Sequence, residues 1–183
     1  MVPSKGSVSL CGQRHDRPKL MRICVRRQVE NREGNRVYMS VYQSTFEINA
    51  PASRVWQVLT ELERYAEWNP QIPWASGRLE VGGRIRLRLA LPTRPTLDLS
   101  ATIEEVQPDR LLTWRGHVVS PWLFEGYRKF AIQPLTDGRV AVTHVEDVHG
   151  VLAPLFSVLM GAAVAKSQQM LNAALRARAE GAQ

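Results

Sequence analysis

The sequence has little cysteine, and none of it lies beyond residue 24. Cys11 and Cys24 are the two cysteines among 183 residues. Together with His15 they match no usual spacing of zinc ligands, and a fourth ligand is missing. The pattern therefore predicts two free thiols, no metal site and no cofactor. Because the rest of the chain lacks cysteine and no export signal is visible, we expect a reducing, cytoplasmic location.

Long apolar runs are also absent. No stretch approaches the roughly 20 residues of a transmembrane helix, and none has the apolar core of a secretory signal. The chain is nevertheless 44% hydrophobic and 22% charged, which is ordinary for a globular protein. Its length suits one domain with a sizeable packed core.

Acidic residues are scarce only at the N-terminus. The first 36 residues hold nine Lys/Arg and three Asp/Glu, so 15 basic and 14 acidic residues remain in the rest of the chain, a net charge of +1 there. A phosphate-binding surface needs a basic face on the folded body. The overall charge of +7 therefore does not indicate nucleic-acid binding.

Residues 1–38 are predicted to be a disordered basic head, because they mix Pro, Gly and scattered charge without an apolar period. Two alternatives stay open. The head is Arg-rich and poor in acids, as organellar targeting segments are. Translation could also begin at Met39, directly before the first predicted strand.

The body, residues 39–180, alternates apolar and polar residues in a way typical of strands with one covered face. The clearest case is Ile85, Leu87 and Leu89 between arginines, with Arg88 and Asp98 expected to face each other on the outside. The turn at 136–138 suits a three-residue hairpin. Seven strands are predicted, at residues 41–49, 74–81, 84–91, 97–104, 112–118, 125–134 and 139–150.

Helical periods occur in two places. Residues 52–69 fit two short helices that end before Pro70. Residues 154–178 form one long helix, about 37 Å at 1.5 Å per residue, and are predicted to cover the sheet with a broad apolar stripe. The stripe consists of Leu152, Leu155, Phe156, Leu159, Ala162 and Ala163, followed by Met170, Leu171, Ala174 and Leu175. The fold class is therefore α+β.

Three segments resemble one known family. Val55-Trp56 with Tyr65 and Trp68-Asn69-Pro70, the segment EVQPDRLLTW at 105–114, and the strand THVE at 143–146 are similar to segments of the START-like (SRPBCC) superfamily, polyketide cyclase/dehydrase type. The resemblance covers residues 41 to about 178. It implies a helix-grip fold, a curved antiparallel sheet around a long terminal helix, with a cavity for lipids, hormones or polyketide intermediates between them.

The last hairpin carries the candidate polar site. If Leu135 pairs with Arg139, Arg128 lies opposite Glu146 and Phe130 opposite His144, all on the apolar, inward face. A buried arginine needs a partner, and Glu146 can provide one. Either these side chains orient a ligand, or they only tie two strands together. The predicted ligand-binding residues are Leu87, Leu89, Trp114, Arg128, Phe130, His144, Glu146 and Leu159, and Trp122 and Phe124 are predicted at the cavity entrance.

The main interpretation is a binding or carrier protein for a small hydrophobic molecule with one polar group. A cyclase, aromatase or dehydratase that uses His144 as acid/base is an alternative, because histidine titrates near neutral pH, although no catalytic motif carries over. A chaperone-interaction module is a third possibility. A homodimer is left open.

Overall fold

The computed structural model describes residues 22–30, 36–117, 120 and 122–181. Its centre is one antiparallel sheet with strand order β1-β2-β8-β7-β6-β5-β4-β3. The first strands are β1 (Arg22–Glu30) and β2 (Arg36–Ile48), and the next are β3 (Trp74–Gly77), β4 (Arg84–Leu89) and β5 (Leu97–Gln107). The last are β6 (Leu111–His117), β7 (Glu125–Pro134) and β8 (Val140–His149).

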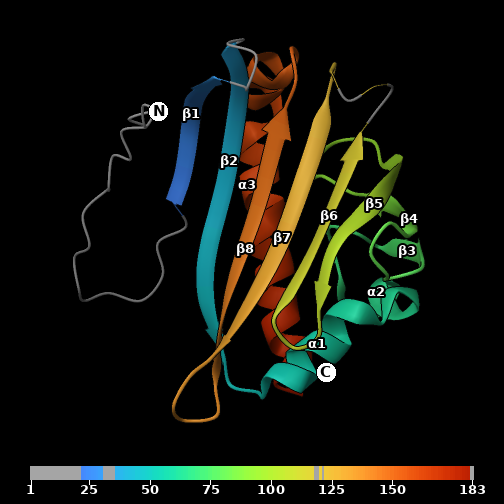
Figure 1. The fold of residues 1–183 in the computed structure, drawn as a ribbon, viewed down its shortest axis with the longest axis vertical. Helices are drawn as coiled ribbons and strands as arrows, with labels where there is room; N and C mark the ends of the chain where they lie inside the picture. The colour runs from blue at the N-terminus through green and yellow to red at the C-terminus, as the bar shows by residue number, and fades with distance from the viewer. Residues whose placement is uncertain (1–21, 31–35, 118–119, 121, 182–183) are drawn as a thin grey trace, which may run out of the picture.

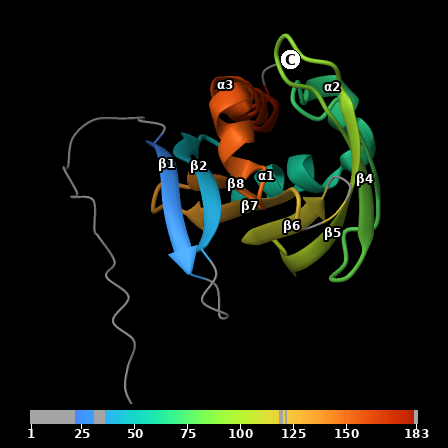
Figure 2. The same ribbon diagram turned by 90° about the horizontal axis from the view of Figure 1, so that it is seen from above.

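The described residues also form three α-helices. Two short ones, α1 (Ala52–Thr60) and α2 (Tyr65–Trp68), are joined by a 3₁₀ turn at Leu62–Arg64. The long helix α3 (Ala153–Ala179) has 27 residues and is therefore about 40 Å long. It runs along β2 and β8 (Figure 1), and the sheet curls around it (Figure 2). This is the predicted helix-grip arrangement.

The register of the last hairpin is confirmed. The amide of Leu135 donates to the carbonyl of Arg139 over 2.8 Å, and Gly138 takes a positive φ of 78° in the turn. Arg128 then lies opposite Glu146, and Phe130 opposite His144. The turn geometry and the apolar inner faces together set these pairs, because in a sheet one residue of slip would turn every side chain to the other face.

The outer row of β4 is also confirmed. Arg84, Arg86 and Arg88 are exposed, whereas Ile85 and Leu87 are buried. Arg88 pairs with Asp98 on β5, with 2.7 Å between Nε and Oδ1.

The two edges of the sheet differ from the prediction. The strand expected at residues 74–81 ends at Gly77, whose φ of +134° turns the backbone away, and any side chain there would collide with the carbonyl of Arg84 at 2.3 Å. In addition, residues 22–30 form β1, which pairs with the first half of β2. The unpaired edge of a long strand such as β2 readily accepts another strand. Residues 1–21 and 31–35 of the predicted disordered head lie outside the described residues, and its boundary at residue 38 stays a prediction.

The prediction of an apolar stripe that packs on the sheet is wrong for the first half of α3. Leu171 and Leu175 are buried as predicted, but Leu155 and Leu159 are 57% and 60% exposed, and Met170 in the second half is 42% exposed. The helical period explains this. Nine residues separate Leu159 from the fully buried Gln168, and at about 100° per residue this places Leu159 on the opposite side of the helix.

Candidate functional site

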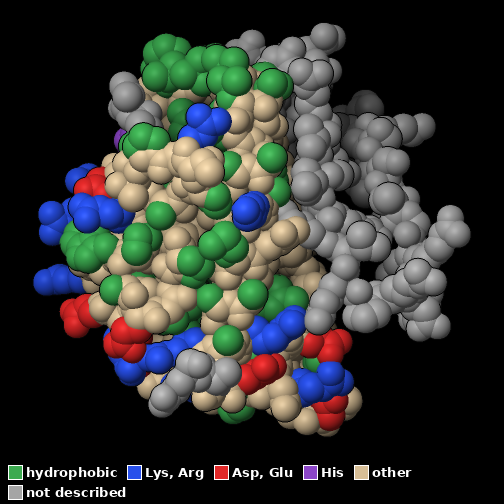
Figure 3. Space-filling model, turned by 180° about the vertical axis from the view of Figure 1, so that it is seen from behind, with side chains coloured by type: hydrophobic (Ala, Val, Ile, Leu, Met, Phe, Trp, Pro, Cys, Tyr) green, Lys and Arg blue, Asp and Glu red, His purple; other side chains and the backbone are tan. Residues whose placement is uncertain are grey.

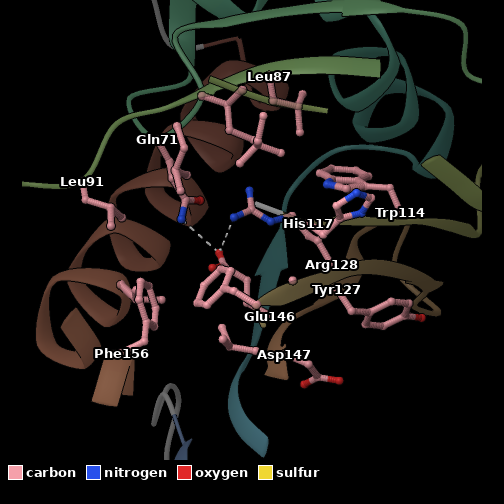
Figure 4. A pocket seen from close by; sticks show the side chains of 18 residues that line it. Gln71, Leu87, Leu91, Trp114, His117, Tyr127, Arg128, Glu146, Asp147 and Phe156 are labelled. Carbon is pink, nitrogen blue, oxygen red and sulfur yellow. Dashed lines mark hydrogen bonds and ion pairs between the residues drawn. The ribbon is translucent and has the colours of Figure 1, made fainter. Parts of the chain in front are cut away.

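A cavity lies between the middle of the sheet and α3 (Figure 4). Its volume is about 100 Å³, whereas sites for drug-sized ligands usually measure roughly 300–1,000 Å³. The wall is mostly apolar, although the strands also contribute His117, Tyr127 and Asp147 to it. Its apolar wall includes Ile72, Leu87, Leu89, Leu99, Trp114 and Val164.

A buried ion pair forms one side of this cavity. Arg128 Nη2 lies 2.9 Å from Glu146 Oε1, and both side chains are about nine-tenths buried. Gln71, from the loop after α2, donates its Nε2 to the same carboxylate oxygen over 3.1 Å. Figure 4 shows the Gln71 amide and the Arg128 guanidinium converging on Glu146. One carboxylate thus holds a strand and a loop that are 75 residues apart in the chain.

The loop that carries Gln71 is fixed by a local turn. The side-chain oxygen of Asn69 accepts hydrogen bonds from the amides of Gln71 and Ile72, over 3.1 and 2.9 Å. This is the Asx turn typical of asparagine before a chain reversal. The turn fixes the backbone at Gln71, from which its side chain reaches Glu146.

The carboxylate is charged at neutral pH. Burial by itself would raise the pKa of Glu146, but the charge of Arg128 and the contacts with His144 and Gln71 outweigh this and lower its pKa to about 2. The Arg128 guanidinium also lies over the Trp114 ring, 5.7 Å from its centroid. The pair is therefore a neutral unit of two opposite charges inside the fold.

Two polar atoms in the cluster of Arg128, Glu146 and Gln71 have no hydrogen-bond partner within the described chain. They are Arg128 Nη1, a donor, and Gln71 Oε1, an acceptor. Both residues line the cavity, and Arg128 Nη1 points away from Glu146, on the side of Leu87 (Figure 4). Unpaired polar atoms at this depth are costly, so they mark where a ligand or water would be held.

His144 lies behind this site and is not among the residues that line the cavity. It is fully buried and stacks on Phe130 with 4.2 Å between ring centroids. Its Nδ1 contacts Asn172 Oδ1 on α3 at 2.8 Å, and its Nε2 lies 3.3 Å from Glu146 Oε1. Burial lowers the pKa of His144. The imidazole therefore reaches the cavity only through Glu146.

A second hollow, the outer groove, opens on the surface where α3 begins. Its volume is about 470 Å³, and its lining is apolar except for one arginine. Figure 3 shows hydrophobic side chains gathered at this end of the molecule. The outer groove is lined by Arg94, Leu97, Leu123, Phe124, Leu152, Leu155, Phe156, Leu159 and Met160.

The structure brings together five of the eight predicted ligand-binding residues. Leu87, Leu89, Trp114, Arg128 and Glu146 line the cavity. Phe130 and His144 are buried behind it, whereas Leu159 lines the outer groove. The role of all eight in ligand binding stays a prediction.

Of the two predicted entrance residues, Phe124 lines both the cavity and the outer groove. Trp122 is 69% exposed and lines neither. Both assignments to an entrance stay predictions.

Sequence reasoning missed Gln71 and the cavity-facing role of Phe156. The Asn69-Pro70 pair indicated a turn, but nothing local showed that the next side chain reaches Glu146. Phe156 was placed in the apolar stripe, and its contact with Phe124, 4.7 Å between ring centroids, joins segments that the periodicity treats separately.

Comparison with known families matches residues 39–180 to the family described as "Polyketide cyclase / dehydrase and lipid transport". The chain belongs to this family. Polyketide cyclase/dehydrase proteins and lipid-transport proteins share its description, which therefore covers both the carrier and the cyclase interpretation of the sequence. A search of curated proteins finds no match.

Solved structures confirm the fold of this polyketide cyclase/dehydrase family member. The Zhui aromatase/cyclase from Streptomyces sp. R1128 superposes with a TM-score of 0.64 at 18% identity, over 78% of this chain and 94% of that one. A START superfamily protein from Mycobacterium smegmatis gives 0.61 at 19% identity, over 78% and 99%. Truncated norcoclaurine synthase from Thalictrum flavum gives 0.59 at 11% identity, over 77% and 93%.

Two searches of the described residues gave negative results. No helix among them is both long and apolar enough to cross a membrane. No group of three or more His, Cys, Asp or Glu side chains in the described ranges is arranged to hold a metal ion.

Proposed function

We propose that this protein binds a small hydrophobic molecule that carries one polar group, in the cavity between the sheet and α3. The observation that supports it best is the pair of unpartnered polar atoms, Arg128 Nη1 and Gln71 Oε1, on a mostly apolar wall. Ligand sites typically combine such an apolar lining with a few convergent polar groups. Membership in a family of cyclases, dehydrases and lipid-transport proteins agrees with this.

The position of His144 favours binding over acid/base catalysis by this residue. A general acid or base must come within hydrogen-bond reach of its substrate, and His144 is fully buried behind Phe130 and Glu146. Its Nε2 lies 3.3 Å from Glu146 Oε1, so it can act on a ligand only through that carboxylate, and we treat it as a positioning residue.

Filling the cavity tests the proposal. Leu89 lines the cavity and is half-buried, so Leu89→Trp is expected to occupy the space of the ligand. Native mass spectrometry after mild purification should show a small co-purifying molecule on the wild type and not on Leu89→Trp.

Arg84→Trp is the matched control, because Arg84 lies on the same strand but on the exposed face. It should keep the bound molecule. A molecule that remains on Leu89→Trp, or is lost equally from both variants, would contradict binding in this cavity.

A further inference from the structure

We propose that the ligand site has two compartments and takes an amphipathic molecule, with a neutral hydrogen-bonding head such as a hydroxyl in the cavity and an apolar chain in the outer groove. This rests on the proposed function, because it specifies the ligand class of the same site. The argument combines the sizes of the two spaces, their connection and the charges in the inner one.

The volumes of the two spaces fit a ligand with a small head and a larger apolar body. The cavity, at about 100 Å³, accommodates a head group of a few atoms, whereas the outer groove, at about 470 Å³, accommodates a much larger apolar body. A hydrophobic molecule confined to the cavity would bury little surface. The same molecule extended into the outer groove would gain affinity with each methylene that it buries.

Two aromatic rings separate the compartments. Phe124 and Phe156 line both spaces and meet edge to face, 4.7 Å between their centroids. The backbone on both sides is fixed, because the amides of Val151 and Leu152 donate to the carbonyls of Trp122 and Leu123, over 3.1 and 3.2 Å. In the proposed site the chain of the ligand passes between the cavity and the outer groove at these two rings.

The charges of the cavity select a neutral head. Arg128 is already balanced by Glu146 at 2.9 Å, so a carboxylate would add an unpaired negative charge and an ammonium an unpaired positive one. The atoms left over beside this pair are a donor, Arg128 Nη1, and an acceptor, Gln71 Oε1, and the lining residue Asp147 adds a further unpaired acceptor, Oδ1. A hydroxyl can accept from the first and donate to the second.

The outer groove fits an apolar chain. Leu155 and Leu159 are more than half exposed, and Arg94 is the single charged residue among those that line the groove. Because Phe124 and Phe156 line both the outer groove and the cavity, the groove is assigned to the remainder of the same ligand.

The test uses normal alkan-1-ols from butanol to decanol, with two NMR reporters, the indole N–H of Trp114 in the cavity and the methyl groups of Leu159 in the outer groove. Butanol should shift only the Trp114 signal. Longer alcohols should shift both, and affinity should rise about four-fold for each added methylene. Octanoate and octylammonium should bind at least ten-fold more weakly than octanol at pH 7.

Variants separate the two compartments. Leu159→Asp should remove most of the gain in affinity from butanol to decanol. Met170→Asp is the matched control, because Met170 is also an exposed apolar residue of α3 but does not line the outer groove. It should keep the gain.

The outcomes distinguish this proposal from the proposed function. Butanol binding that Leu89→Trp abolishes, together with an affinity that does not rise with chain length, would overturn the two-compartment site and leave the proposed function standing. The two-compartment site would also be overturned if Leu159→Asp and Met170→Asp lost the rise in affinity from butanol to decanol equally. A third result against it would be a dimer in sedimentation experiments that Leu159→Asp dissociates, together with alcohols that bind equally well at all chain lengths. Failure of every alcohol to shift Trp114 would overturn both proposals.

Discussion

Arg128 and Glu146 place two opposite charges where the surrounding residues are mostly apolar. Each is costly to bury alone, and the pair is tolerated because its 2.9 Å contact is supported by Gln71, His144 and the Trp114 ring. Burying such a pair adds little net stability, whereas removing one partner leaves an uncompensated charge. The two residues therefore depend strongly on each other.

A double-mutant cycle measures this dependence. We expect Glu146→Gln to lower the free energy of unfolding by about 3–5 kcal/mol, because Arg128 is left buried without a counter-charge. The double variant Arg128→Met/Glu146→Gln carries no buried charge and should be more stable than Glu146→Gln alone. Urea denaturation gives all four values, and additive losses would contradict the coupling.

The stability of the fold should also depend on pH through His144. Burial lowers its pKa below the ordinary 6.5, so the unfolded chain takes up a proton before the folded one does. The contribution of His144 to stability is therefore complete above pH 6.5 and is lost as the pH falls below that value. Glu146 further lowers the free energy of unfolding as the pH falls from 4.5 to about 2.

Melting temperatures at pH 7.5, 6.5 and 5.5 check the histidine term. The wild type should lose stability over this range, and His144→Asn, which keeps an amide near Asn172, should lose less. An equal decline in both proteins would assign the pH dependence to other groups.

At the scale of elements, α3 has two different halves. Its second half packs Leu171, Leu175 and Ala179 into the core, while its first half exposes Leu155 and Leu159. In the middle of α3, Gly161 faces Tyr42 of β2. A Cβ added at Gly161 would lie 3.0 Å from the Tyr42 hydroxyl. The glycine thus permits a close approach between the helix and the sheet.

Gly161→Ala separates helix propensity from this contact. In an unobstructed helix the change would stabilise by about 1 kcal/mol, but here the contact with the buried Tyr42 hydroxyl should cancel the gain or reverse its sign. Tyr42→Phe removes that oxygen, which has no hydrogen-bond partner among the described residues. In a Tyr42→Phe background, Gly161→Ala should therefore raise the melting temperature, and the absence of any rise would contradict the steric account.

For the molecule as a whole, β1 is expected to contribute little to the stability of the fold. β1 pairs only with β2 at the edge of the sheet, whereas β2 is paired along its other side with β8 over residues 39–48. Among the residues whose side chains are described, the core begins at Tyr42. The folded body therefore has its main contacts without β1.

Deletion of residues 1–38 tests this directly. We expect the remaining chain to fold, to keep its circular dichroism spectrum and to lose only a few degrees in melting temperature, because the β2–β8 ladder and the core remain. Binding of alkan-1-ols should persist. A shortened chain that fails to fold would show that β1 is part of the stable unit.

The sequence by itself determined the features that depend on neighbours along the chain. Alternating residues identified the inner and outer faces of β4, and the three-residue turn after Leu135 set the register that places Arg128 opposite Glu146. Local periodicity contains this information because a strand or turn repeats within a few residues.

Only the tertiary structure decided how distant segments meet. It brought Gln71 to Glu146, put His144 behind the cavity rather than in it, turned Leu159 out into the outer groove and gave the cavity its small volume. The position of α3 within the curved sheet sets all four. A cavity is the space that packing leaves over, so it depends on many small displacements at once and on no single repeat in the sequence.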